Sequence, residues 1–184
     1  MSTDALSGTD RSRERSWPAR LPPTRFLRTV RYVKAPTSSA RKATDGLYLD
    51  DLHFGQRFTS GTHVVDEEQI KAFARQFDPQ PFHLDNEAVF SGLAASGWHT
   101  AAVAMRLLVE GGLPFASGIV GAGGELNWPN PARPGDTLQV ESEVLDIRLS
   151  RQGRGAATVQ SVTRNPRNEV EQRLTTKSIV RCRA

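Results

Sequence analysis

The chain has 184 residues, the size of one ordinary domain, and 38% of them are hydrophobic, which is low for a compact protein. A pI near 9.7 suggests a nucleic-acid-binding protein, but the basic residues gather at the start of the chain. Residues 1–45 hold ten Lys and Arg against four acidic residues, a net charge of +6, whereas the rest carries a net −2. The expected folded part is therefore not basic, which argues against nucleic acid as a partner.

The N-terminal segment predicts a flexible tail. Ser, Thr, Pro and Arg dominate it with little hydrophobic periodicity, so burial cannot offset the entropy lost on ordering. Regular apolar spacing starts at Leu47, and we expect residues 1–46 to be a flexible basic extension and residues 47–184 to be the folded domain. No apolar run is long enough for a membrane span, and the one cysteine, Cys182, fits a reducing compartment. The sequence predicts a soluble, cytoplasmic protein.

A strand is expected between His53 and Val65, followed by a helix with clear start and stop signals. Asp66 can accept hydrogen bonds from the free amides of the first turn, and Gln69 stands three residues later, as in a capping box. Pro79 ends the helix, which puts Asp78 in the turn after it. The buried face is expected to hold four apolar residues: Ile70, Phe73, Ala74 and Phe77.

The second half of the domain predicts one more helix and then strands. A helix is expected from about Gly97 through Glu110, because apolar residues recur there at helical spacing. Strands are expected at 119–120, 125–128, 137–144, 156–163 and 173–180, with a turn at 165–168. A strand, two helices and several antiparallel strands make an α+β domain in which a sheet wraps a helix.

Asp78 and His83 are the candidate acid/base pair. They lie five residues apart across two prolines, so a short stiff loop is expected to present both side chains. A His titrates near neutral pH, and a neighbouring carboxyl can deliver or receive a second proton. The alternative is that Asp78 only caps a turn while His83 is an ordinary surface residue.

Gly97 is the candidate oxyanion donor. It opens the second helix, where its backbone N–H is free to hold a carbonyl oxygen as negative charge builds on it. In the alternative interpretation Gly97 only permits tight packing. His99, on the same helix, is assigned to packing or hydrogen bonding, and no carboxylate stands at a ligand spacing from His53 or His63, so no metal site is expected.

In its motifs the chain from Leu52 to Arg181 resembles the MaoC-like dehydratase family, which includes (R)-specific enoyl-CoA hydratases with the hot-dog fold. Four segments carry the resemblance in the same order: Phe54-Gly55-Gln56, Phe77 to Asp85, Ala95-Ser96-Gly97, and Arg133 to Asp136. The second segment is Asp-x-Asn-Pro-x-His in the family and has Gln80 in place of Asn. The third is usually Ala-His-Gly, and Ser96 takes the place of His.

The resemblance implies a hot-dog fold and a lyase of fatty acid metabolism that hydrates 2-enoyl-CoA or dehydrates 3-hydroxyacyl-CoA without a metal or other cofactor. It implies catalytic roles for Asp78 and His83 and an oxyanion role for Gly97, with Gln80 and Ser96 in the same substrate pocket. It also implies a homodimer or a higher homo-oligomer. The alternatives are a non-catalytic acyl-CoA-binding domain and, less favoured, a thioesterase, for which Glu110 is the only acid on the helix and lies at the wrong end.

Overall fold

The computed structural model describes residues 46–85, 91–150 and 153–183. Residues 1–45 of the predicted extension lie outside them, and the predicted domain boundary stays a prediction. The strands are β1 (Arg57–Val64), β2 (Val120–Asn127), β3 (Thr137–Ser150), β4 (Arg154–Arg164) and β5 (Val170–Arg181). The helices are α1 (Glu67–Phe77), α2 (Pro81–Leu84) and α3 (Gly97–Leu107), with short turns of 3-10 helix at Leu49–Asp51 and π-helix at Leu108–Gly112.

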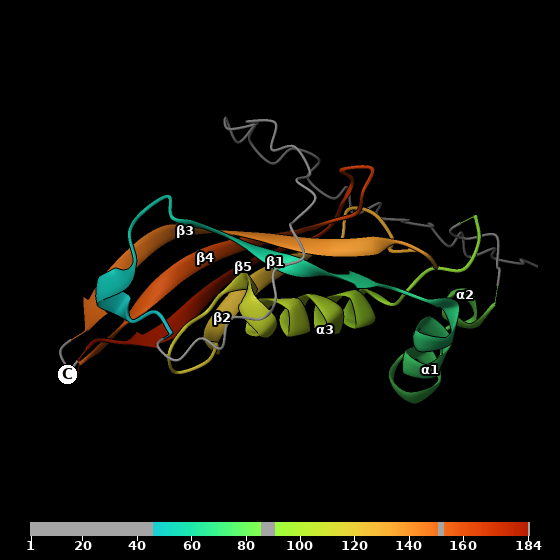
Figure 1. Cartoon of the computed structure of the whole chain (residues 1–184). Coiled ribbons are helices and arrows are strands. Elements are labelled where there is room, and N and C mark those ends of the chain that lie inside the picture. Colours follow the sequence, from blue (N-terminus) through green and yellow to red (C-terminus); the bar gives the residue numbers. More distant parts are fainter. Residues whose placement is uncertain (1–45, 86–90, 151–152, 184) are drawn as a thin grey trace, which may run out of the picture. The chain divides into compact units, whose positions relative to one another are not determined.

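The five strands form one antiparallel sheet in the order β1-β3-β4-β5-β2. Helix α3 runs along one face of this sheet, while α1 and α2 lie at the end where α3 begins (Figure 1). This is the α+β architecture that the sequence predicts. Strands β3, β4 and β5 are each longer than the predicted segments. The two strands predicted at 119–120 and 125–128 form the single strand β2, with a register shift between Gly121 and Gly124.

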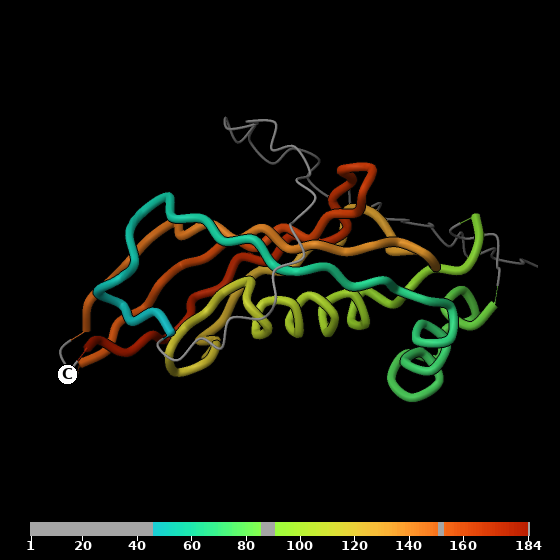
Figure 2. Tube along the Cα trace, viewed as in Figure 1, coloured from blue at the N-terminus to red at the C-terminus, as the bar shows by residue number. Residues whose placement is uncertain are grey.

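The first and the last described residues lie at the same end of the sheet, as the tube in Figure 2 shows. The backbone N–H of Arg183 donates to Asp50, and its guanidinium pairs with Asp51 and lies over the Tyr48 ring. These contacts tie the C-terminal end of β5 to the segment that precedes β1. The contacts lie at the end of the sheet away from α1 and α2 (Figure 1).

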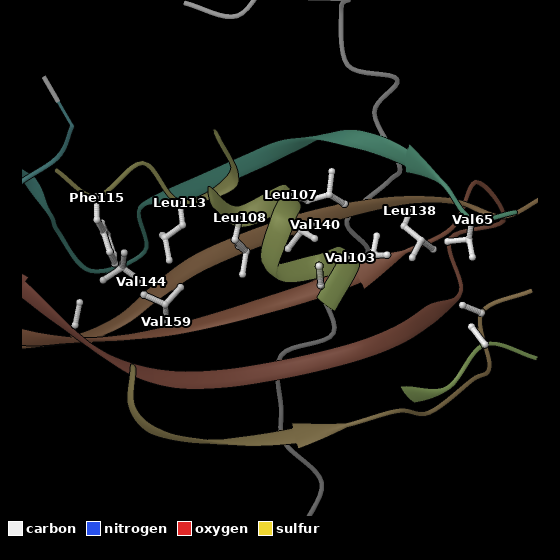
Figure 3. Packing of buried hydrophobic residues seen from close by; sticks show 14 of the residues in the cluster. Val65, Val103, Leu107, Leu108, Leu113, Phe115, Leu138, Val140, Val144 and Val159 are labelled. Carbon is white, nitrogen blue, oxygen red and sulfur yellow. The ribbon is translucent and has the colours of Figure 1, made fainter. Parts of the chain in front are cut away.

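The core lies between α3 and the sheet (Figure 3). Strand β4 alternates buried and half-buried residues, because successive side chains of a strand point to opposite faces. The buried face of the sheet meets the apolar face of α3, which contributes Val103, Ala104 and Leu107. Alanine at this contact lets the helix approach the sheet closely.

Helix α1 buries fewer residues than the sequence predicts. Asp66 caps it by accepting from the Gln69 N–H at 2.8 Å, as expected, but the Gln69 side chain bonds to His63 rather than completing a capping box. Ile70 and Ala74 are buried, whereas Phe77 is 64% exposed. The prediction for Phe77 is wrong: it is the last residue of α1, and its ring contacts Phe73 of the same helix instead of joining the core.

Glu171 is a carboxylic acid buried inside this fold. It lies in β5 beside the register shift opposite Thr163 and Arg164, and it is 1% exposed. Burial raises the pKa of Glu171 to about 8, and the nearby Asp136 carboxylate raises it further, while Asn165 and Arg167 act in the opposite direction. At neutral pH the side chain is therefore mostly protonated.

The free energy of unfolding should depend on the Glu171 proton. Because the folded pKa of about 8 lies above the ordinary value of 4.5, the stabilising effect of the proton is complete below about pH 4.5 and is lost as pH rises toward 8. The slope can reach about 1.4 kcal/mol per pH unit. Urea unfolding at several pH values should show a flatter profile for Glu171→Gln. If the free energy of unfolding of Glu171→Gln depends on pH as steeply as that of the wild type, the prediction is wrong. Glu68→Gln, on the exposed face of α1, serves as the control.

Candidate functional site

Asp78 lies at the end of α1, where the sequence predicts the helix to stop. Its backbone N–H still donates to the Ala74 carbonyl at 2.9 Å, but its own φ and ψ of −152° and 68° are not helical, since Pro79 follows. The buried residues Ile70 and Ala74 fix α1 against the domain. The carboxylate of Asp78 is thereby held at a defined place, with 17% of its side chain exposed.

His83 does not lie in a loop, as the sequence analysis expected, but in the one-turn helix α2. Pro81 occupies its first position, where a missing N–H costs nothing and the fixed φ favours a helix. The two prolines thus end one helix and start another. This short turn buries the His83 ring, which is 6% exposed, so the alternative of an ordinary surface His is excluded.

The two side chains face each other. His83 Nε2 lies 3.3 Å from Asp78 Oδ2, and His83 Nδ1 lies 2.8 Å from the backbone carbonyl oxygen of Ala94. A carbonyl oxygen only accepts, so Nδ1 must carry a proton. In the neutral ring Nε2 is then the free basic atom, and it lies beside the carboxylate.

Two neutral donors hold the Asp78 carboxylate. Ser96 Oγ donates to Oδ2 at 2.6 Å, and Gln80 Nε2 donates to Oδ1 at 2.7 Å. The Ser96 hydrogen bond is the main reason why the pKa of Asp78 lies below its ordinary value. Burial acts in the opposite direction, and Gln80 and the nearby His83 lower the pKa further. Asp78 is therefore ionised over the whole neutral range.

Ser96 and Gly97 form the start of α3. The Ser96 hydroxyl caps the helix by accepting from the Trp98 N–H at 3.2 Å. Gly97 occupies the first helical position, and among the described residues its N–H has no hydrogen-bond acceptor. The positive end of the helix dipole is at the same point. An anionic oxygen placed here would meet a free donor.

A pocket of about 360 Å³ brings these groups together. Each of the five predicted site residues lines it: Asp78, Gln80, His83, Ser96 and Gly97. Its wall also includes two tryptophans that the sequence analysis missed, Trp98 and Trp128. Trp128 directly follows the edge strand β2, and nothing in the local sequence indicates that its ring reaches Gly97.

The other histidines lie outside the pocket. His99 is buried and stacks on Phe73 with ring centroids 5.0 Å apart, and burial lowers its pKa, with a further contribution from His63. This is the packing role that the sequence predicts. The described parts of the chain contain no group of three or more His, Cys, Asp or Glu side chains that could hold a metal ion. Within the same residues, no helix is both long and apolar enough to cross a membrane.

Known proteins are similar to this chain in sequence and in fold. A MaoC-like dehydratase from Rhodospirillum rubrum is 57% identical, with a TM-score of 0.74, covering 76% of this chain and 99% of that one. The R-hydratase PhaJ1 from Pseudomonas aeruginosa, at 23% identity and a TM-score of 0.59, covers 76% of this chain and 88% of its own, and shows the fold alone. The Bacillus subtilis protein YdeM is 36% identical over 124 residues, covering 64% of this chain and 86% of its own.

The architecture is the hot-dog fold of these neighbours, which confirms the predicted fold. The model of the MaoC-like domain matches residues 52–165, which is more than half of the chain. The resemblance carried by the four sequence motifs is confirmed by this match. The chain belongs to the MaoC-like domain family.

Proposed function

We propose that this protein is a hydro-lyase that reversibly hydrates a 2-enoyl-CoA thioester, or dehydrates the 3-hydroxyacyl form. The observation that carries the proposal is the Asp78 and His83 pair, 3.3 Å apart in a pocket that also contains the free Gly97 N–H. A base, an acid and an oxyanion donor are the groups that this reaction requires. Membership of the MaoC-like domain family supports the same reaction class.

In the hydration direction, a water oxygen adds to C3 of the enoyl group and its proton passes to His83 Nε2. The electron pair of the double bond moves toward the thioester carbonyl, where the Gly97 N–H stabilises the enolate oxygen. The imidazolium then gives the proton to C2. Asp78 stays ionised because Ser96 and Gln80 donate hydrogen bonds to its carboxylate. The negative charge of Asp78 then stabilises the imidazolium. Dehydration follows the same steps in reverse.

The main prediction concerns the acid/base pair. Asp78→Asn and His83→Gln should each reduce kcat for crotonyl-CoA hydration at least about a hundredfold, since positioned acid/base groups contribute roughly that much. Matched substitutions outside the pocket, Asp146→Asn and His53→Gln, should leave the rate unchanged. The assay is loss of the enoyl absorbance, and unchanged rates in the pocket variants would falsify the proposal.

The hydrogen bonds to Asp78 should be visible in the titration of its own carboxyl group. Because the Ser96 hydroxyl lowers the pKa of Asp78, Ser96→Ala should raise that pKa in an NMR titration of the Asp78 carboxyl carbon. Gln80→Ala, which leaves the α3 cap intact, should raise the pKa less. Ser96→Ala should also cost about 1 kcal/mol of stability through the lost cap. An Asp78 pKa that is the same in both variants as in the wild type contradicts this role.

The same assay separates the two other candidates. Binding of acyl-CoA without any consumption would indicate a non-catalytic binding domain. Release of free thiol would indicate a thioesterase, for which Glu110 is poorly placed: it pairs with Arg106 at 2.8 Å and lies outside the pocket. A cytoplasmic location is part of the proposal and rests on the single free cysteine, Cys182.

We expect the protein to be at least a homodimer. Among the described strands, β2 lies at the edge of the sheet and pairs with β5 alone, and seven of its eight residues are exposed. Such an edge is a template for pairing with a second copy. Light scattering should give twice the mass of the 20.2 kDa chain. Val120→Lys, on this edge, should weaken the dimer, whereas Phe54→Lys, away from β2, should not. A monomer at all concentrations contradicts the expectation.

A further inference from the structure

Trp128 lies directly against the start of α3. It is the first residue after β2, and its indole covers Gly97 so closely that a Cβ added there would lie 2.7 Å from the ring atom Cδ2. Only glycine at position 97 leaves room for the ring. Trp128 therefore forms the part of the pocket wall next to the candidate oxyanion donor.

The indole is fixed in this position by a hydrogen bond. Trp128 Nε1 donates to Gln172 Oε1 at 3.0 Å, and Gln172 is a fully buried residue of β5, with 1% of its surface exposed. Rotating the ring away would leave the buried amide oxygen without this donor, which is unfavourable because water does not replace the lost hydrogen bond there. Trp128 is thus a rigid part of the wall.

The backbone beyond Trp128 is held as well. Pro129 and Pro131 restrict the loop, and the Asn130 side chain donates to the Val170 carbonyl at 2.8 Å. The Ala95 N–H donates to the carbonyl of Ala132 at 2.9 Å, which joins this loop to the segment that leads into α3. The wall and the oxyanion donor are therefore parts of one connected unit.

The pocket is small. Its volume of about 360 Å³ lies at the lower end of the range of roughly 300–1,000 Å³ that small-molecule sites occupy. Asp78 and His83 line it together with the Trp128 indole, Pro129 and Pro131. A thioester that reaches Gly97 must therefore lie next to the indole.

We infer that Trp128, held by Gln172, is a specificity-determining residue that limits the acyl group to short chains. This inference rests on the proposed action on acyl thioesters. A rigid ring cannot move aside for a longer chain, and one methylene that an apolar pocket does not accommodate changes kcat/KM by roughly 10- to 200-fold. The substrate class is thus a short-chain 2-enoyl or 3-hydroxyacyl thioester.

The experiment compares hydration of crotonyl-CoA and 2-octenoyl-CoA. The wild-type protein should prefer the four-carbon substrate at least tenfold in kcat/KM. Trp128→Ala should raise the ratio of eight-carbon to four-carbon activity at least tenfold. Trp128→Phe, which keeps most of the wall, and Gln172→Met, which only releases the ring, should raise it severalfold. Phe54→Ala, an exposed aromatic outside the pocket, is the control.

The outcomes separate this inference from the proposed function. If the wild type turns over and the Trp128 variants lose activity by the same factor on both substrates, the ring is only structural and the inference is wrong. If no enoyl thioester is hydrated, the proposed function fails, and calorimetric binding of butyryl-CoA and octanoyl-CoA tests the wall without turnover. Trp128→Ala should then strengthen octanoyl-CoA binding relative to butyryl-CoA, and an unchanged binding ratio overturns the inference.

Discussion

The Ser96 hydroxyl connects the Asp78 carboxylate to the start of α3, where the Gly97 N–H lies. Its oxygen accepts a hydrogen bond from the Trp98 N–H and so caps the start of α3. Its O–H donates a hydrogen bond to Asp78 at the end of α1. Ser96 is 1% exposed, so water does not compete for either bond. One buried side chain therefore sets where the helix begins, and with it the position of the Gly97 N–H relative to the carboxylate.

The extended segment before α3 holds the remaining parts of the site in place through its backbone. The Ala94 carbonyl accepts from His83 Nδ1, and the Ala95 N–H donates to the loop after β2 at Ala132. These two adjacent peptide groups connect α2, the segment before α3 and the tryptophan-bearing loop. Since backbone groups cannot change rotamer, the tautomer of His83 and the path of the loop are fixed together.

The sequence predicted the features that local rules determine. Asp66 as a cap, Pro79 as a stop and Gly97 as a helix start depend only on neighbours along the chain, and each is observed. The burial of His83 could not be predicted in this way, because it depends on a one-turn helix and on the Ala94 carbonyl eleven residues away. The same holds for Trp128, whose partner Gln172 is 44 residues later in the sequence.

The two departures from the family motifs have the same physical consequence. Gln80 and Ser96 replace Asn and His, and both donate to Asp78 from side chains that carry no charge. A His at position 96 would itself titrate near neutral pH, and its effect on the carboxylate would change with its charge. Serine donates the same hydrogen bond at every pH between 5 and 8. The two hydrogen bonds that Ser96 and Gln80 donate to Asp78 therefore do not depend on the protonation state of the donor side chain.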